Sequence, residues 1–130
     1  MTLADVKDYI KTFGIAEHYY IGKLDNKQDK SIGIYPLRRN SPPVTSLGQS
    51  STYDIKGVSI LVHWNKNAVE TEKTALKLFE QLRKTKNIQI NNTMIYFALL
   101  KVSEPVDVGT DDSGVYERVI EIEFYYRKED

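Results

Sequence analysis

The chain has no cysteine among its 130 residues. Disulfide bonds, thiolate nucleophiles and cysteine-ligated metal centres are therefore excluded. Apolar runs are also short, and none approaches the roughly 20 residues that a membrane-spanning helix needs. The first residues lack the basic-then-apolar order of a secretory signal. We therefore expect a protein that is made in the cytoplasm and does not associate with a membrane.

The chain also lacks an excess of charge of either sign, because 18 Lys and Arg residues balance 18 Asp and Glu residues. A protein that binds by neutralising phosphates normally has a basic excess or a basic stripe. The balance therefore argues against nucleic-acid binding, and it weakens the self-repulsion that keeps copies of a protein apart. A hydrophobic content of 41% is ordinary for a globular protein, so we expect residues 1–130 to form a single domain.

Residues that commonly perform catalysis are few and lie apart in the sequence. His18 and His63 fall in predicted strands without a partner motif, and the motifs of serine hydrolases, zinc proteases and phosphate-binding loops are absent. Asp107–Gly114 is rich in carboxylates, but its spacing does not match a calcium-binding loop and its composition is typical of turns. The sequence therefore predicts no catalytic, cofactor-binding or metal-binding residue.

Two segments have the periodicity of amphipathic helices. In Thr2–Phe13, apolar residues recur at three- and four-residue steps, Thr2 and Asp5 have the spacing of a capping box, and Gly14 is suited to end the helix. Asn67–Lys84 is the second helix, with Asn67 as its cap. The apolar face predicted for this second helix consists of Ala68, Val69, Ala75, Leu76, Leu78, Phe79 and Leu82.

Three segments in the first half of the chain have the composition of strands. His18–Leu24 and Ser31–Leu37 are rich in β-branched and aromatic residues and flank a polar turn, which predicts an antiparallel hairpin. In Tyr53–Trp64 the alternation of apolar residues changes phase at Lys56 and Gly57. One extra residue at that point would be a β-bulge, and glycine is favoured in bulges.

The second half predicts two more long strands. Met94–Val102 is apolar on both faces, as central strands usually are. In Val115–Arg127, apolar side chains alternate with charged ones, so one face is expected to be buried and the other to meet solvent or a partner. The predicted fold is α+β, with a mostly antiparallel sheet of about five strands and two helices packed on one of its faces.

Two polar segments and the charged face of the last strand hold residues that the predicted core does not need. The segments are Arg39–Thr52 and Ser103–Gly114, and loops longer than about 12 residues are often functional. The chain also has nine tyrosines, which are favoured at protein interfaces but can equally pack against a sheet. The residues predicted to contact other proteins are Arg38, Arg39, Leu47, Asp107, Asp111, Asp112, Glu117, Glu121, Glu123 and Arg127.

A resemblance to a known family comes from the last third of the chain. The segment EPVDVGTDDSGVYE (Glu104–Glu117) and the strand end FYYR (Phe124–Arg127) resemble the C-terminal part of small siphophage neck proteins. These are known as minor capsid proteins in phages and prophages of Gram-positive bacteria. Over nearly the full length, the order of predicted elements is similar to that of the tail terminator, or tail-to-head joining, fold.

The resemblance implies a structural virion protein and not an enzyme. It implies a subunit that assembles with copies of itself into a ring, expected to be a hexamer, at the head-proximal end of the tail tube. The implied partners are the major tail tube protein and a head-completion or connector protein. The implied location is the tail and neck of the virion, reached from the host cytoplasm during assembly.

Two other classes of function stay open at this point. One is a bacterial protein-binding module unrelated to phage assembly, which would share the neutral charge and the absence of catalytic motifs. The other is an enzyme whose site forms between subunits, for which His63 and the Glu121 face would have to line a deep pocket.

Overall fold

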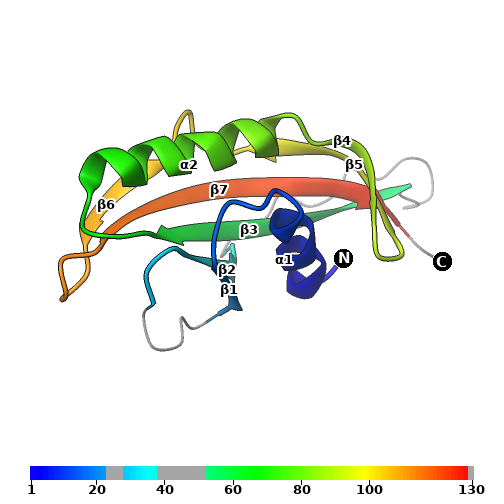
Figure 1. Cartoon of the computed structure of the whole chain (residues 1–130). Coiled ribbons are helices and arrows are strands. Elements are labelled where there is room, and N and C mark those ends of the chain that lie inside the picture. Colours follow the sequence, from blue (N-terminus) through cyan, green and yellow to red (C-terminus); the bar gives the residue numbers. More distant parts are fainter. Residues whose placement is uncertain (23–27, 38–51, 129–130) are drawn as a thin grey trace.

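The computed structural model describes residues 1–22, 28–37 and 52–128. Two helices pack on a curled sheet, with the long strand β7 running through its middle (Figure 1). The elements are α1 (Leu3–Lys11), β1 (His18–Ile21), β2 (Ser31–Pro36), β3 (Tyr53–His63), α2 (Ala68–Arg83), β4 (Lys86–Ile90), β5 (Thr93–Leu100), β6 (Val106–Thr110) and β7 (Tyr116–Arg127).

The sheet has seven strands in the order β1-β2-β3-β7-β5-β4, and β6 also pairs with β7. One side of β7 is occupied by β3 along its whole length. The other side is shared, because β5 pairs with the C-terminal half of β7 and β6 with its N-terminal half. All pairs except β1–β2 are antiparallel. The α+β class is confirmed, with more strands than the five expected, since β4 is separate and the segment Ser103–Gly114, predicted as a loop, contains β6.

Both helices begin at the residues that the sequence predicts. The Thr2 hydroxyl accepts a hydrogen bond from the Asp5 amide (3.1 Å), and the Asp5 carboxylate accepts one from the Thr2 amide (2.9 Å), so the capping box is complete. The Asn67 side chain accepts a hydrogen bond from the Glu70 amide at the start of α2. Gly14 has a φ of +66°, a conformation that glycine adopts without strain. Local sequence therefore sets the start of both helices, whereas α1 ends at Lys11 with Thr12 as its C-cap, two residues before Gly14.

The apolar face of α2 is narrower than predicted. Ala75, Leu78, Phe79 and Leu82 are buried as expected. Ala68, Val69 and Leu76 are exposed instead, and Val69 keeps 62% of its surface. The helix lies on the sheet along one stripe, so side chains at the margin of a wide apolar face turn away from the core.

The predicted hairpin between the first two strands is wrong, because β1 and β2 are parallel. Tyr19 pairs with Ile32 and Ile21 with Ile34, so the register rises in the same direction along both strands. The Lys30 carbonyl accepts hydrogen bonds from the amides of Glu17 and His18, which places the start of β2 beside the start of β1. Composition identifies a strand but does not encode its direction, which depends on the path of the connection.

The β-bulge predicted at Lys56 and Gly57 is also wrong. β3 pairs with β7 in one unbroken register from Tyr53 opposite Arg127 to His63 opposite Glu117. The change of phase instead marks the point along β3 at which the apolar side chains move from one face of the sheet to the other. Val58, Ile60 and Val62 face the helices, whereas Tyr53 and Ile55 point to the opposite face, which we call the helix-free face. The register shifts of this sheet lie in β5 and β6.

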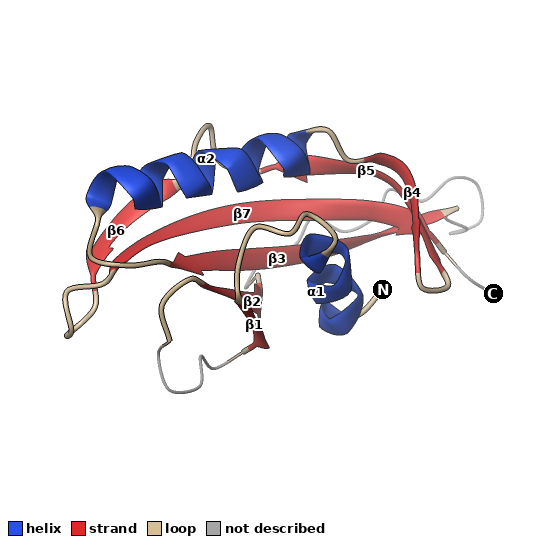
Figure 2. Cartoon of the chain, viewed as in Figure 1, coloured by secondary structure: helices blue, strands red, loops and turns tan. Residues whose placement is uncertain are grey.

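The core lies between the helices and one face of the sheet, and both helices contribute to it (Figure 2). Tyr9 of α1 meets Phe124 of β7 edge to face at 6.1 Å, and its hydroxyl shares a 2.8 Å hydrogen bond with the Thr85 hydroxyl. Burial raises the pKa of Tyr9, partly offset by that hydrogen bond. The fully buried apolar residues of the sheet are Ile32, Ile34, Val58, Ile60, Val62, Ile95, Ile120, Ile122 and Phe124.

Candidate assembly surface

The residues predicted to contact other proteins separate into three groups. Arg38, Arg39 and Leu47 lie outside the described residues, as does the segment Arg39–Thr52 up to residue 51. A second group is exposed or half-buried, and a third is tied into the fold. The second group is Asp107, Asp112, Glu121 and Arg127; the third is Asp111, Glu117 and Glu123.

Asp111 and Glu117 hold the turn before β7 against the end of β3. His63 is 1% exposed; its Nδ1 lies 2.8 Å from the Glu117 carboxylate and its Nε2 lies 3.8 Å from the Asp111 carboxylate. The other Asp111 oxygen accepts hydrogen bonds from the amides of Ser113 and Val115, both at 2.9 Å. His63 is therefore a structural residue, as expected, but with two carboxylate partners that the sequence did not indicate. With 1% of its side chain exposed, His63 is not open to solvent in the described structure.

Glu123 is an exception to the expectation that the charged face of β7 meets solvent or a partner. Its side chain is fully buried in the described structure, and one oxygen lies 3.7 Å from the Lys101 ammonium. Glu123 sits in the middle of β7, opposite Gly57 of β3 and Leu99 of β5. Alternation along a strand fixes the face of a side chain, whereas burial depends on the strands on either side.

Three aromatic rings stack across β5, β7 and β3 on the helix-free face. Phe97 and Tyr125 lie 4.5 Å apart with their planes at 15°, and Tyr125 and Tyr53 lie 5.7 Å apart at 23°. Burial, and to a smaller extent the charge of Glu123 and the neighbouring Tyr53, raises the pKa of Tyr125. Phe97 and its neighbour Leu99 remain 44% and 47% exposed. Large apolar side chains are thus available to a partner on the face without helices.

β6 continues this apolar surface along the same side of β7. All five of its residues are exposed, and Val106 and Val108 keep 44% and 49% of their surface. Its inner side is held by Arg118, whose guanidinium lies 3.8 Å from Asp107 and 3.4 Å from the Pro105 carbonyl. We call the exposed set on these two strands the β5–β6 flank; it consists of Phe97, Leu99, Val106 and Val108.

Sequence reasoning did not name the four residues of the flank, although Val106 and Val108 lie within the segment Ser103–Gly114 that it predicted to be part of the interface. The signal was present in Met94–Val102, which is apolar on both faces. That pattern correctly predicted a strand between two others, since β5 lies between β7 and β4. It does not distinguish a strand covered on both faces from one whose second face is left for a partner.

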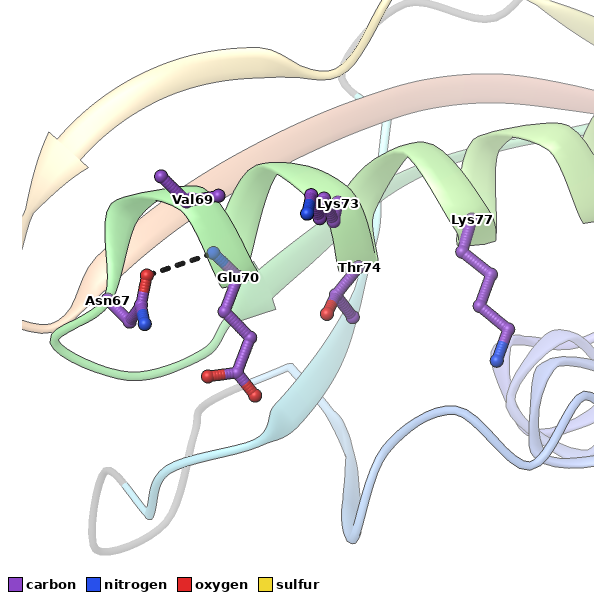
Figure 3. A pocket seen from close by; sticks show the side chains of 6 residues that line it. All are labelled: Asn67, Val69, Glu70, Lys73, Thr74 and Lys77. Carbon is purple, nitrogen blue, oxygen red and sulfur yellow. Dashed lines mark hydrogen bonds between the residues drawn. The ribbon is translucent and has the colours of Figure 1, made fainter.

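The described residues contain a shallow hollow along the outer side of α2. Glu70, Thr74 and Lys77 project to the same side of the helix (Figure 3), and Asn67, Val69 and Lys73 complete the lining. All of these residues belong to α2 or its cap, so the hollow is a surface groove and not an enclosed pocket. No group of three or more His, Asp or Glu residues in the described part of the chain is placed to hold a metal ion. Within the same residues, no helix is long and apolar enough to span a membrane.

Comparison with protein families places nearly the whole chain in one of them. The model of the bacteriophage tail terminator protein family matches residues 4–128. No curated protein matches the chain. The family match decides against a bacterial module unrelated to phage, and it bears out the structural role that the resemblance in the last third of the sequence implied. The chain belongs to the bacteriophage tail terminator protein family, and it is a structural component of a phage tail.

Proposed function

We propose that this protein caps the head-proximal end of the tail tube as a ring of identical copies and joins the tail to the head connector. The observation that carries the proposal is the family match over residues 4–128, because it covers every described helix and strand except Leu3, the first residue of α1. A terminator stops polymerisation by covering the end of the tube, so its partners are the major tail tube protein on one side and a head-completion or connector protein on the other.

The described surface has apolar and charged residues that are suited to such contacts. The β5–β6 flank offers apolar area, and Asp107, Asp112, Glu121 and Arg127 add exposed or half-buried charges that can select a complementary partner. The neutral net charge allows copies to approach one another. We expect the isolated protein to be a monomer or weak oligomer in dilute solution and a ring, expected to be a hexamer, in the particle.

Deletion of the gene from a phage that carries it tests the proposal directly. We expect tails of uncontrolled length and heads without attached tails, because nothing ends the tube or joins it to the head. Electron microscopy of the lysate measures both. Supplying the intact gene in trans is the control and should restore tails of one length. Normal infectious particles after a clean deletion would rule out the terminator role.

Reversal of one exposed charge tests the polar part of the proposed surface. Glu121→Lys should leave folding nearly intact, because a partly exposed charge contributes little to stability. It should lower the yield of complete particles, because like charges across an interface repel. Glu123 is unsuitable for this test, since its burial couples assembly to folding. A folded Glu121→Lys protein that gives normal particle yield would exclude Glu121 from the interface.

A further inference from the structure

The two outer strands in one half of the sheet, β1 and β6, lie on the same cross-strand rows. In one row His18 pairs with Ser31, Ser31 with His63, His63 with Glu117, and Glu117 with Gly109. This half of the molecule is therefore a five-stranded sheet, β1-β2-β3-β7-β6, with an edge strand at each end. The edges have similar lengths, at four and five residues.

The two edge strands run in opposite directions. β1 is parallel to β2, and each of the next three steps, to β3, β7 and β6, reverses the direction. Three reversals leave β6 antiparallel to β1. A second copy placed beside the first, with its helices on the same side of the sheet, would therefore bring its β1 against β6 as an antiparallel pair. That is the orientation of most pairs in this sheet, and antiparallel pairs are slightly the more stable per residue.

Each edge exposes apolar side chains and has one strand neighbour among the described residues. β6 carries Val106 and Val108 in the exposed set, and β1 ends in Ile21, which is 42% exposed. Both edges are short, and β6 carries Asp107, which are features that limit edge pairing in many proteins. The exposed valines and isoleucine nonetheless give both edges apolar area for a partner strand.

Charge favours pairing between unlike edges over pairing between two copies of β6. The segment from Ser103 to Glu117 contains five carboxylates and no Lys or Arg. Glu104 and Asp112 in it are exposed, whereas Asp107 lies 3.8 Å from Arg118. Two β6 edges would bring these like charges together, which destabilises cross-strand pairs. β1 itself, His18–Ile21, contains no carboxylate. The carboxylate of Glu17, the residue before it, lies 3.9 Å from the Lys30 ammonium.

We infer that β6 of one copy pairs with β1 of the next, so that the sheet continues from subunit to subunit. This inference rests on the proposed ring and names the contact that forms it. A contact between two different edges is heterologous, and such contacts close into a ring when the rotation between neighbours allows it. The strand that pairs with the β6 edge is thus β1 of a second copy of this chain. The alternative is a strand of the tail tube protein, and the test below distinguishes the two.

The absence of native cysteine makes a clean cross-linking test possible. Val108→Cys and Ile21→Cys are made as single variants, mixed, and treated with a short bismaleimide, both in concentrated solution and in particles that carry both variants. We expect a covalent dimer from the mixture and none from either variant alone. Val69→Cys replaces Ile21→Cys in the control mixture, because Val69 is exposed on α2 and belongs to neither edge. It should give no dimer with Val108→Cys.

Three outcomes would overturn the inference. The first is a covalent dimer formed by Val108→Cys alone, and the second is cross-linking of Val108→Cys to Val69→Cys as efficient as to Ile21→Cys. The third is complete particles in which Val108→Cys is cross-linked to the tail tube protein and not to Ile21→Cys. The deletion experiment is independent of all three. Tails of uncontrolled length after deletion, combined with a failed cross-link, would retain the terminator role and reject this edge contact.

A matched pair of charge substitutions provides a second readout. Val108→Lys should lower ring formation by about tenfold or more, since the pairing would bury an unpaired ammonium. Val69→Lys adds the same charge at a similarly exposed valine and should leave ring formation unchanged. Both variants should unfold at the temperature of the parent. A folded Val108→Lys protein that forms rings normally would contradict the inference.

Discussion

The two faces of β7 differ in how their side chains are buried. Toward the helices, Ile120, Ile122 and Phe124 are apolar and fully buried. On the helix-free face, Glu121 is half-buried and Glu123 is fully buried, although neither of the described helices covers them. The difference shows that a charged strand face is not necessarily a solvated one. Here it combines a buried carboxylate, a row of stacked aromatic rings and exposed apolar side chains, which is a composition suited to a protein partner.

Truncation of phenylalanine on the two faces should give the largest contrast. Phe124→Ala removes a fully buried ring and should lower the free energy of unfolding by about 3–5 kcal/mol. Phe97→Ala removes a ring that is partly exposed on the helix-free face and should cost about 1 kcal/mol, mainly its stacking on Tyr125. Urea denaturation of both variants measures the difference. Equal losses would mean that the helix-free face is as closely packed as the core.

Charge reversal within the helix-free face should separate Glu123 from Glu121. Glu123→Lys places a second ammonium beside Lys101 in a buried site and should cost about 3 kcal/mol or more. Glu121→Lys should cost less than about 1 kcal/mol. The midpoints of urea unfolding, at unchanged slope, provide the comparison. A Glu123→Lys protein as stable as Glu121→Lys would show that Glu123 reaches water.

Loss of the His63 contacts should have an intermediate effect, confined to one end of the sheet. His63→Phe keeps the ring volume but removes the partner of Glu117 and Asp111, and should cost about 2 kcal/mol. Hydrogen exchange should quicken at the turn amides of Ser113 and Val115, whose acceptor Asp111 loses its anchor. Unchanged exchange there would show that the turn holds without the histidine.

A small effect is expected in the helix layer, at the cap of α1. Burial would raise the pKa of Asp5, but hydrogen bonds from Asn91 and Thr2 outweigh it and lower the pKa. A carboxylate with a lowered pKa stabilises the fold above its unfolded pKa, and that stability is lost as the pH falls through the folded value. Asp5→Asn should therefore cost about 1 kcal/mol at pH 7, with the difference from the parent shrinking in acid. Thermal unfolding of the parent and the variant at pH 7 and in acid checks this prediction. A difference in stability that is the same under both conditions would exclude the charge of the carboxylate as its cause.

The sequence by itself determined the features that depend on residues close together in the chain. Thr2, Asp5 and Asn67 cap their helices through partners three residues away, so the pattern alone locates both starts. The alternation in Val115–Arg127 placed Ile120, Ile122 and Phe124 together on the face that is buried, because strand geometry repeats every two residues. The last third also carried the resemblance that the family match over residues 4–128 bears out.

Only the tertiary structure decided features that depend on distant partners. The parallel direction of β1 and the unbroken register of β3 are set by pairing with strands elsewhere in the chain. The burial of Glu123 depends on Gly57 and Leu99, which come from two other strands, and His63 meets Glu117 54 residues away. A pattern within one segment predicts the face to which a side chain points. Whether that side chain is then buried or exposed to another subunit depends on residues from distant segments, which only folding places beside it.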